Sequence, residues 1–393
     1  MTVVSKVYTA LINGIIHTGV DKDPIEGGVL IEGDKIIAVG KFEIPKGSEV
    51  IDLEGDNVFP GFIDPHTHIG LIEQAKGPIG VDGNEATSPI TADVFAVDGI
   101  YPPDNAFKEA IAAGITASMV VPGSANIIGG VGSVIKHYSK DNLISSLVIK
   151  EYGGMKAALG ENPKRAYGSR KITPSTRMAS AAIMRQWLIK AQEYYEKKKN
   201  AEKEPDKMPA KDLKLENLSM VFEGKMPLKV HAHRADDIAT ALRIADEFSI
   251  PITIEHASEA HLIVDHVKKY PFSMVVGPSL GVPTKVETKN KSLKGAKILS
   301  DAGVNVALTT DHPVLPIYRL LHAAAQAVKD GLDEFTALQM ITINPAKVLG
   351  LESKVGSIEV GKDADITVYR GHPFDFLSTC KYTFVSGKKA FKR

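Results

Sequence analysis

The chain has almost no cysteine: among its 393 residues only Cys380 is one, which excludes an internal disulfide and a cysteine-based metal site. It carries no excess charge, because 47 Lys and Arg balance 47 Asp and Glu, so composition gives no argument for a nucleic-acid partner. It lacks the run of about 18 apolar residues that spans a bilayer, and residues 1–19 lack the features of a signal peptide. We therefore expect a soluble, cytoplasmic protein that binds neither nucleic acid nor membrane.

The hydrophobic pattern changes twice along the chain and divides it into two predicted domains. Residues 1–59 are rich in Ile and Val with turn residues between the runs, which is typical of β-structure, and 355–393 return to this pattern. Each piece is short for an independent core, so we predict that both termini join in one small β-sandwich domain. Residues 60–354 alternate short apolar strands with amphipathic helical segments, which predicts an α/β fold, a (β/α)8 TIM-like barrel. An excursion at about 176–226 interrupts the alternation, either as a lid or oligomer contact or as a segment packed on the barrel.

Histidines recur where the apolar runs end. His66 and His68 follow the predicted strand at 58–63, and alternate residues of an extended chain point to the same side, so both imidazoles could bind one metal ion. One such pair is weak evidence, but six of the 12 histidines lie at the ends of strand-like runs: His66, His68, His231, His233, His256 and His312. This recurrence predicts a metal site.

The barrel topology gives these histidines a common location. The strand that ends at His233 precedes residues 236–248, whose apolar side chains mark one face of a helix, and a later strand ends at Asp311. Barrel enzymes build their active sites at the carboxyl ends of the strands. On strand alternation His312 should face away from this site.

Several segments resemble the amidohydrolase superfamily. Residues 60–68, Pro-Gly-Phe-Ile-Asp-Pro-His-Thr-His, are similar to the first-strand signature of that superfamily. Residues 343–350 and 356–366 resemble the junction at which such enzymes leave the barrel and enter their small β-domain. Three further segments are similar to uncharacterised hydrolases of the imidazolonepropionase-related branch: 122–130, 154–163 and 230–236. The resemblance covers nearly the whole chain and implies a metal-dependent hydrolase.

The resemblance implies metal ligands position by position. His66 and His68 match the pair of the first strand. His231 matches the ligand of the fifth strand and His256 that of the sixth. Asp311 matches the aspartate of the last strand, which in the family touches metal and serves as general base.

Many members of the superfamily also have a mid-barrel lysine that is carboxylated by CO₂ and bridges two metals. An unmodified lysine is a cation and a poor ligand, whereas a carbamate supplies two anionic oxygens. Lys156, in a strand-like segment, is our candidate. Lys150, Glu151 and Glu161 are nearby rivals, and an ordinary surface lysine is the alternative.

At two positions this chain lacks a glutamate that better-known enzymes of the superfamily have. Imidazolonepropionases carry a glutamate two residues after the fifth-strand histidine, where this chain has His233. Metal-dependent deaminases often have a glutamate three residues on, where this chain has Arg234. Histidine at the first of these positions resembles peptidase-like members that use a carboxylated lysine. This difference favours hydrolysis of an amide bond.

We therefore predict a metal-dependent hydrolase that cleaves an amide, cyclic amide or dipeptide C–N bond in a small molecule. The cofactor is predicted to be one or two Zn²⁺ ions, with Fe, Mn and Ni as alternatives. A metal-activated water attacks, and Asp311 acts as general base and then acid. His233 or Arg234 holds the developing oxyanion or a substrate carboxylate, unless His233 lies behind the site.

Alternative functions are imidazolonepropionase-type or deaminase activity on a heterocycle, or a non-catalytic scaffold on the same fold. Retention of the five matched ligands disfavours the scaffold. The chain could also form a homo-oligomer.

Overall fold

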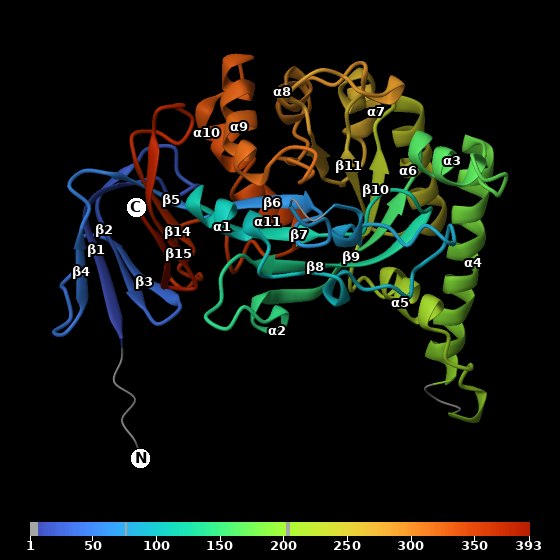
Figure 1. Cartoon of the computed structure of the whole chain (residues 1–393), viewed down its shortest axis with the longest axis horizontal. Helices are drawn as coiled ribbons and strands as arrows, with labels where there is room; N and C mark the ends of the chain where they lie inside the picture. Colours follow the sequence, from blue (N-terminus) through green and yellow to red (C-terminus); the bar gives the residue numbers. More distant parts are fainter. Residues whose placement is uncertain (1–6, 75–76, 202–204) are drawn as a thin grey trace.

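The computed structural model of the chain describes residues 7–74, 77–201 and 205–393 (Figure 1). The first six residues of the predicted terminal domain, and residues 202–204 of the predicted excursion, lie outside this description. No helix within the described ranges is long and apolar enough to cross a bilayer.

The two ends of the chain share one sheet, as predicted. Its path runs β16-β15-β14-β5-β1-β2-β3, and β4 pairs with β1. The strands are β1 (Tyr8–Ile16), β2 (Ile25–Glu32), β3 (Lys35–Gly40), β4 (Glu49–Asp52), β5 (Asn57–Pro60), β14 (Ile366–Arg370), β15 (Thr379–Val385) and β16 (Lys388–Lys392). Apolar residues from both ends, among them Leu11, Val29 and Phe384, are buried together, so neither terminal piece has a separate core.

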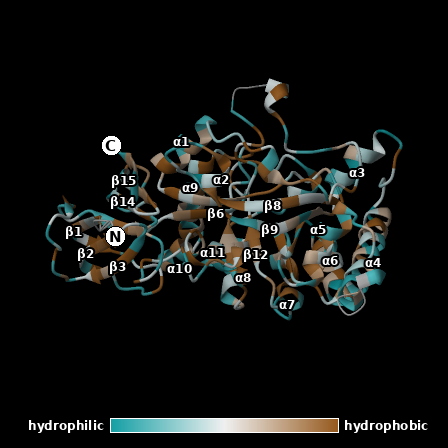
Figure 2. Cartoon of the chain, turned by 90° about the horizontal axis from the view of Figure 1, so that it is seen from below, coloured by the Kyte–Doolittle hydropathy of each residue, from teal (hydrophilic) through white to brown (hydrophobic). Residues whose placement is uncertain are grey.

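The middle of the chain forms an eight-stranded sheet in the order β13-β12-β11-β10-β9-β8-β7-β6. The strands are β6 (Phe62–Thr67), β7 (Ile115–Val120), β8 (Ile128–Lys136), β9 (Val148–Ala158), β10 (Leu228–Ala232), β11 (Ile252–His256), β12 (Met274–Val276) and β13 (Val306–Leu308). Each strand lies beside its neighbours in sequence, which is the order of a TIM-like barrel. Figure 2 shows hydrophobic residues concentrated along these strands.

One strand departs from the predicted parallel pattern. β8 runs antiparallel to both β7 and β9. The physical reason is the length of the connection: β7 ends at Val120 and β8 begins at Ile128, whereas a parallel crossover needs about a dozen residues or more. The barrel is therefore rich in parallel pairs but not composed entirely of βα units.

Side chains join the first barrel strand to the last. The Asp64 carboxylate accepts hydrogen bonds from the Thr309 hydroxyl at 2.7 Å and from the Thr310 amide and hydroxyl at 3.0 and 2.6 Å. Beyond them the His68 N–H donates to the carbonyl of His312 at 2.8 Å. Burial raises the pKa of Asp64 to about 6. These bonds bring the end of β6, with its two histidines, beside the segment that follows β13.

Helices surround the barrel (Figure 1). They are α1 (Asn105–Ala112), α2 (Ile144–Leu147), α3 (Glu161–Gly168), α4 (Arg177–Ala201), α5 (Leu213–Phe222), α6 (Ala235–Phe248), α7 (Val264–Val267), α8 (Lys294–Asp301), α9 (Leu320–Lys329), α10 (Glu334–Gln339) and α11 (Ile343–Leu349). The described part of the predicted excursion consists mainly of α4 and α5. Met184 and Leu188 of α4 and Leu218 of α5 are buried in the main core, so the excursion packs on the barrel.

A glycine links the terminal sheet to the first strand of the barrel. Gly61 separates β5 from β6, and its N–H donates to the carbonyl of Asp365 at 2.8 Å. A Cβ atom at this position would lie 2.2 Å from the hydroxyl of Thr116, so only glycine fits there. Nearby, the buried ammonium of Lys136 bonds Asp363 at 2.7 Å and Asp365 at 3.0 Å across the junction. The orientation of the first metal-site strand is therefore tied to the terminal sheet.

Candidate metal centre

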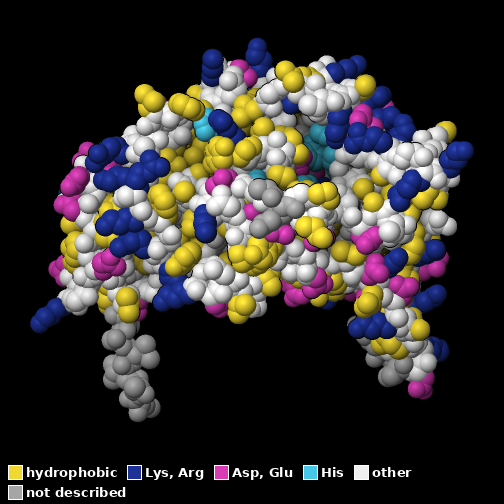
Figure 3. Space-filling view, in the orientation of Figure 1, with side chains coloured by type: hydrophobic (Ala, Val, Ile, Leu, Met, Phe, Trp, Pro, Cys, Tyr) yellow, Lys and Arg dark blue, Asp and Glu magenta, His cyan; other side chains and the backbone are white. Residues whose placement is uncertain are grey.

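The histidines predicted from the strand ends meet at the carboxyl rim of the barrel, the end at which its parallel strands finish. Figure 3 shows histidine side chains in a hollow of the molecular surface. Two groups of side chains there could each hold a metal ion: His66, His68 and Asp311, and His231, His233 and His256. Within each group the candidate ligand atoms lie within 4.8 Å of one another. All of these residues are buried except Asp311, whose side chain is 15% exposed.

The first group joins β6 to the segment after β13. Asp311 Oδ1 lies 3.2 Å from His68 Nε2 and 3.7 Å from His66 Nε2. The other oxygen of Asp311 lies 4.0 Å from Nδ1 of His256, and the rings of His66 and His256 are 4.8 Å apart between centroids. The two groups are therefore adjacent parts of one centre.

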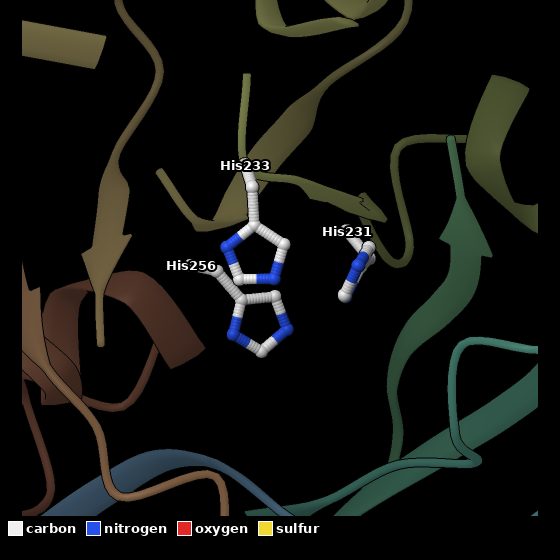
Figure 4. A group of neighbouring side chains, drawn as sticks. All are labelled: His231, His233 and His256. Carbon is white, nitrogen blue, oxygen red and sulfur yellow. The ribbon is translucent and has the colours of Figure 1, made fainter. Parts of the chain in front are cut away.

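The second group lies on β10 and β11. The rings of His233 and His256 are stacked with their centroids 4.8 Å apart, and His231 contacts His256 edge-on at 4.4 Å (Figure 4). His231 and His233 are two residues apart at the end of β10, and the strand pleat directs both to the same side. His233 thus lies in the centre itself, and the alternative position behind the site is excluded.

Lys156 lies between the groups. It is on β9, its side chain is fully buried, and its Nζ is 3.0 Å from His66 Nε2. The surface-lysine alternative is therefore wrong. Burial lowers the pKa of Lys156 to about 8, so the neutral amine is a minor form at pH 7 but far more populated than in an ordinary lysine. Of the predicted rivals, Lys150 instead donates to the carbonyl of Leu349 at 2.7 Å.

Four histidines are oriented by a hydrogen bond at Nδ1. The acceptors or partners are Glu255 for His66 (2.7 Å), the Val121 carbonyl for His68 (2.7 Å), the Gly277 carbonyl for His256 (2.8 Å) and the Ser258 hydroxyl for His233 (2.8 Å). Such partners fix the ring orientation and tautomer of metal-binding histidines. They leave Nε2 as the ring nitrogen available for metal binding, and in His66 this nitrogen contacts Nζ of Lys156 at 3.0 Å.

A buried ion pair between Glu255 and Lys229 contacts His66. Oε2 of Glu255 accepts a hydrogen bond from Nδ1 of His66. Oε1 lies 2.8 Å from Nζ of Lys229, and the side chains of Glu255 and Lys229 are both fully buried. Burial acts to raise the pKa of Glu255, but the charge of Lys229 and the hydrogen bonds from Lys229 and His66 outweigh it and hold the pKa below the ordinary value. Glu255 is therefore an anion that polarises His66.

Burial also favours the metal-binding form of the histidines. It lowers the pKa of His66 and of His233 to about 4. The same cause holds the pKa of His231 and of His256 well below the ordinary value. Neutral imidazole is the form that binds a metal.

The backbone is strained at two of the predicted ligands. His256 has φ of 74° and Asp311 has φ of 53°, in the left-handed region that costs non-glycine residues of order 1–3 kcal/mol. Strain of this kind persists where the surroundings impose it, and it concentrates at functional sites. Here it directs both side chains into the same centre.

The donor set fits a divalent cation. Oδ1 of Asp311 is buried without a hydrogen-bond partner. Unpaired buried polar atoms are costly, and a metal ion would satisfy them. Imidazole and carboxylate together suit the divalent transition metals, Zn²⁺ included.

Two residues discussed from the sequence lie outside the groups. Arg234 forms a two-point ion pair with Asp236, with both N–O distances at 2.9 Å, so its guanidinium is occupied by that carboxylate. This geometry does not support its predicted oxyanion role. His312 is buried and belongs to neither group.

The sequence interpretation missed three polar residues at the centre: Lys229, Glu255 and Glu287. Glu287 lies on the loop after β12, is 1% exposed, and has one oxygen 3.8 Å from Nε2 of both His231 and His233. Glu255 directly precedes His256, and its position in a buried strand was the only available signal.

Comparison with known proteins agrees with this architecture. A barrel with a His- and Asp-lined centre at its carboxyl rim defines a class of metal-dependent hydrolases. The model of the Amidohydrolase family matches residues 57–391, so the chain belongs to the amidohydrolase family.

Individual relatives span several degrees of similarity. The crystal structure of an amidohydrolase from Thermotoga maritima MSB8 is similar over 98% of this chain and 100% of that one, with 44% identity and a TM-score of 0.95. The amidohydrolase tasK of Hapsidospora irregularis is 28% identical over 391 residues, which are 93% of this chain but only 40% of that relative's length. The imidazolonepropionase of Thermoplasma acidophilum is 24% identical over 374 residues, covering 88% of this chain and 83% of that protein.

Proposed function

We propose that this chain is a hydrolase that cleaves an amide, cyclic amide or dipeptide C–N bond in a small molecule. The observation that carries the proposal is the meeting of His66, His68 and Asp311 with His231, His233 and His256 at one rim. Membership of the amidohydrolase family supplies the reaction class. A cytoplasmic location and a homo-oligomeric state remain predictions.

The metal ligands we propose are His66, His68, Asp311, His231, His233 and His256, together with Lys156. Zn²⁺ is the first candidate because the centre is rich in imidazole. When bound, the metal supplies an activated water and polarises the carbonyl of the substrate.

Lys156 is proposed to carry a CO₂-derived carbamate, whose two anionic oxygens would serve as metal ligands. Its burial and lowered pKa support this role, because CO₂ reacts with a neutral amine. Its Nζ already touches His66 at the junction of the two groups. A carbamate there would add negative charge where the neutral histidines supply none.

Asp311 is proposed to move the proton. Its carboxylate is partly exposed at the hollow and has one oxygen without a hydrogen-bond partner. It would accept a proton from the attacking water and deliver it to the leaving nitrogen. His233, oriented by Ser258, is proposed to bind the metal through Nε2 together with His231. Its predicted oxyanion role would require a proton on the same nitrogen, so metal binding replaces that role in this proposal.

Imidazolonepropionase-type chemistry is the second candidate, and the Thermoplasma acidophilum relative favours it. Against it stands His233, which occupies the position where the resemblance implies a glutamate. A panel that includes an imidazolone separates the two candidates.

The test is turnover by metal-loaded protein on a panel of dipeptides, N-acyl amino acids, cyclic amides and an imidazolone. We expect hydrolysis of an amide or peptide, its loss after chelation, and its return when Zn²⁺ and bicarbonate are restored. Hydrolysis of the imidazolone alone would replace the first candidate by the second. A chelated protein that keeps its full activity would contradict a metal-dependent hydrolase.

A further inference from the structure

Glu287 is a buried carboxylate that points into the centre without a hydrogen bond at one of its oxygens. Oε1 is buried with no hydrogen-bond partner, although the residue is only 1% exposed. Burying an unpaired carboxylate oxygen is costly, and native structures rarely leave one without a compensating partner. The groups around this oxygen therefore indicate what kind of partner it binds.

Two histidine nitrogens face this oxygen at equal distances. Oε1 lies 3.8 Å from Nε2 of His231 and 3.8 Å from Nε2 of His233. These separations are too long for hydrogen bonds. Zinc–ligand bonds are about 2.0–2.2 Å, so two ligand atoms on the same ion lie roughly 3–4 Å apart. The spacing therefore suits three ligands around one ion.

The other half of the carboxylate is held in place by the chain. Oε2 accepts a hydrogen bond from the backbone N–H of Glu161 at 3.0 Å. Gly160 has φ of 87°, and a Cβ there would lie 2.7 Å from Oε2, so glycine makes room for the carboxylate. This anchoring aims Oε1 at the histidines.

Among the histidines of the two groups, His231 is the one without a hydrogen bond at Nδ1. Its Nδ1 is buried without a hydrogen-bond partner, and its Nε2 lies 3.4 Å from the side-chain nitrogen of Asn162. If Asn162 donates to Nε2, a proton on Nδ1 has no acceptor. A metal ion on Nε2 would replace this weak contact.

One cation lies close to the same oxygen. Nζ of Lys285 is 3.7 Å from Oε1 and donates to Oδ1 of Asn162 at 3.0 Å. Its side chain is 26% exposed, so it can turn toward solvent when an ion binds. Lys285 therefore offers a way to separate simple charge pairing from metal binding.

We propose that Glu287 is a metal ligand, which binds the same ion as His231 and His233 and supplies a negative charge to that group. The assignment rests on the proposed metal centre and extends it by one residue from the loop after β12. It makes the two groups alike in charge, with Asp311 in the first and Glu287 in the second.

The test measures zinc affinity rather than turnover. Metal-free wild-type protein and the Glu287→Gln variant are titrated with Zn²⁺ against a chromogenic chelator, and bound zinc is counted by mass spectrometry. Loss of a partner that only orients a metal ligand costs about 10–100-fold in metal affinity, so loss of a direct ligand should cost at least as much. We expect one zinc equivalent to weaken by about tenfold or more in Glu287→Gln while any other is retained.

Two matched variants test whether a loss of zinc affinity in Glu287→Gln comes from the loss of a direct ligand. Glu161→Gln removes a carboxylate on the same side of the site but keeps the backbone N–H that anchors Glu287, so it should bind zinc like the wild type. Lys285→Met removes the competing cation and should bind zinc equally or more tightly. If Glu287→Gln fails to fold, Glu287→Asp keeps the charge on a shorter side chain and should also weaken zinc binding.

Three results would overturn the assignment. Glu287→Gln that is folded and binds zinc like the wild type would exclude a ligand role. Lost turnover with unchanged zinc affinity would instead make Glu287 a substrate contact. Wild-type protein that binds no zinc would contradict the proposed centre as a whole, which distinguishes that failure from the failure of Glu287 alone.

Discussion

The two histidine groups of the centre are supported in different ways. His66, in the first group, rests on the buried pair of Glu255 and Lys229, and all three side chains come from strands of the barrel. In the second group, His231 has no partner at Nδ1, and the nearest carboxylate is Glu287 from a loop. In the first group, buried strand residues already hold His66 in place. In the second group, His231 lacks such a partner, so we infer that its orientation becomes fixed only when a metal ion binds.

The largest expected effect is on catalysis. Asp311→Asn keeps the size of the side chain but removes the proposed proton acceptor, and general acid–base catalysis contributes about 10²–10⁴-fold. We expect turnover of an identified substrate to fall by a factor in this range. The measurement is kcat with zinc content determined on the same sample, and wild-type turnover in the variant would remove Asp311 from the mechanism.

The next largest effect is on zinc binding at the first group alone. Glu255→Gln should weaken zinc binding at the first group by about 10–100-fold, because the residue orients and polarises His66. It also leaves Lys229 buried without a counter-charge, which should lower the free energy of unfolding by about 3–5 kcal/mol. Chelator titration measures the first quantity and urea unfolding of the metal-free protein the second.

The double variant Glu255→Gln with Lys229→Met is the control for this prediction. It removes both buried charges, so most of the stability should return while the zinc affinity stays low. Equal instability of the single and double variants would show that the cost does not come from an unpaired lysine.

The smallest effect concerns the second group. Ser258→Ala removes the hydroxyl that meets Nδ1 of His233, and one such hydrogen bond is worth about 1 kcal/mol. We expect zinc affinity at the second group to fall by about fivefold. A loss as large as that in Glu255→Gln would mean that both groups depend equally on their partners.

Much of this centre could be predicted from the sequence because its ligands follow simple periodic elements. Strand alternation explains why His66 and His68 share a direction, and α6 begins within one residue of the helix predicted at 236–248. The resemblance to amidohydrolases identified Lys156 as a candidate, and the structure shows it buried beside His66. Family membership and fold agree with the prediction, while the roles of the individual residues remain proposals.

What could not be predicted depends on geometry that no local pattern specifies. Glu255 and His256 are consecutive, and regular alternation would direct them to opposite sides. The positive φ of His256 breaks that alternation and brings both side chains to the centre. Glu287 lies on a loop, where its approach to His231 depends on packing across the barrel. The reversed direction of β8 could have been found from the short connection that precedes it.

The most direct test of the account is anomalous diffraction at the zinc edge, from crystals of the full chain grown with Zn²⁺ and bicarbonate. We expect two peaks, one among His66, His68 and Asp311 and one among His231, His233 and His256, with density for a carbamate on Lys156 beside His66. Crystals without an anomalous peak among these residues would contradict the central claim that this rim is a metal centre.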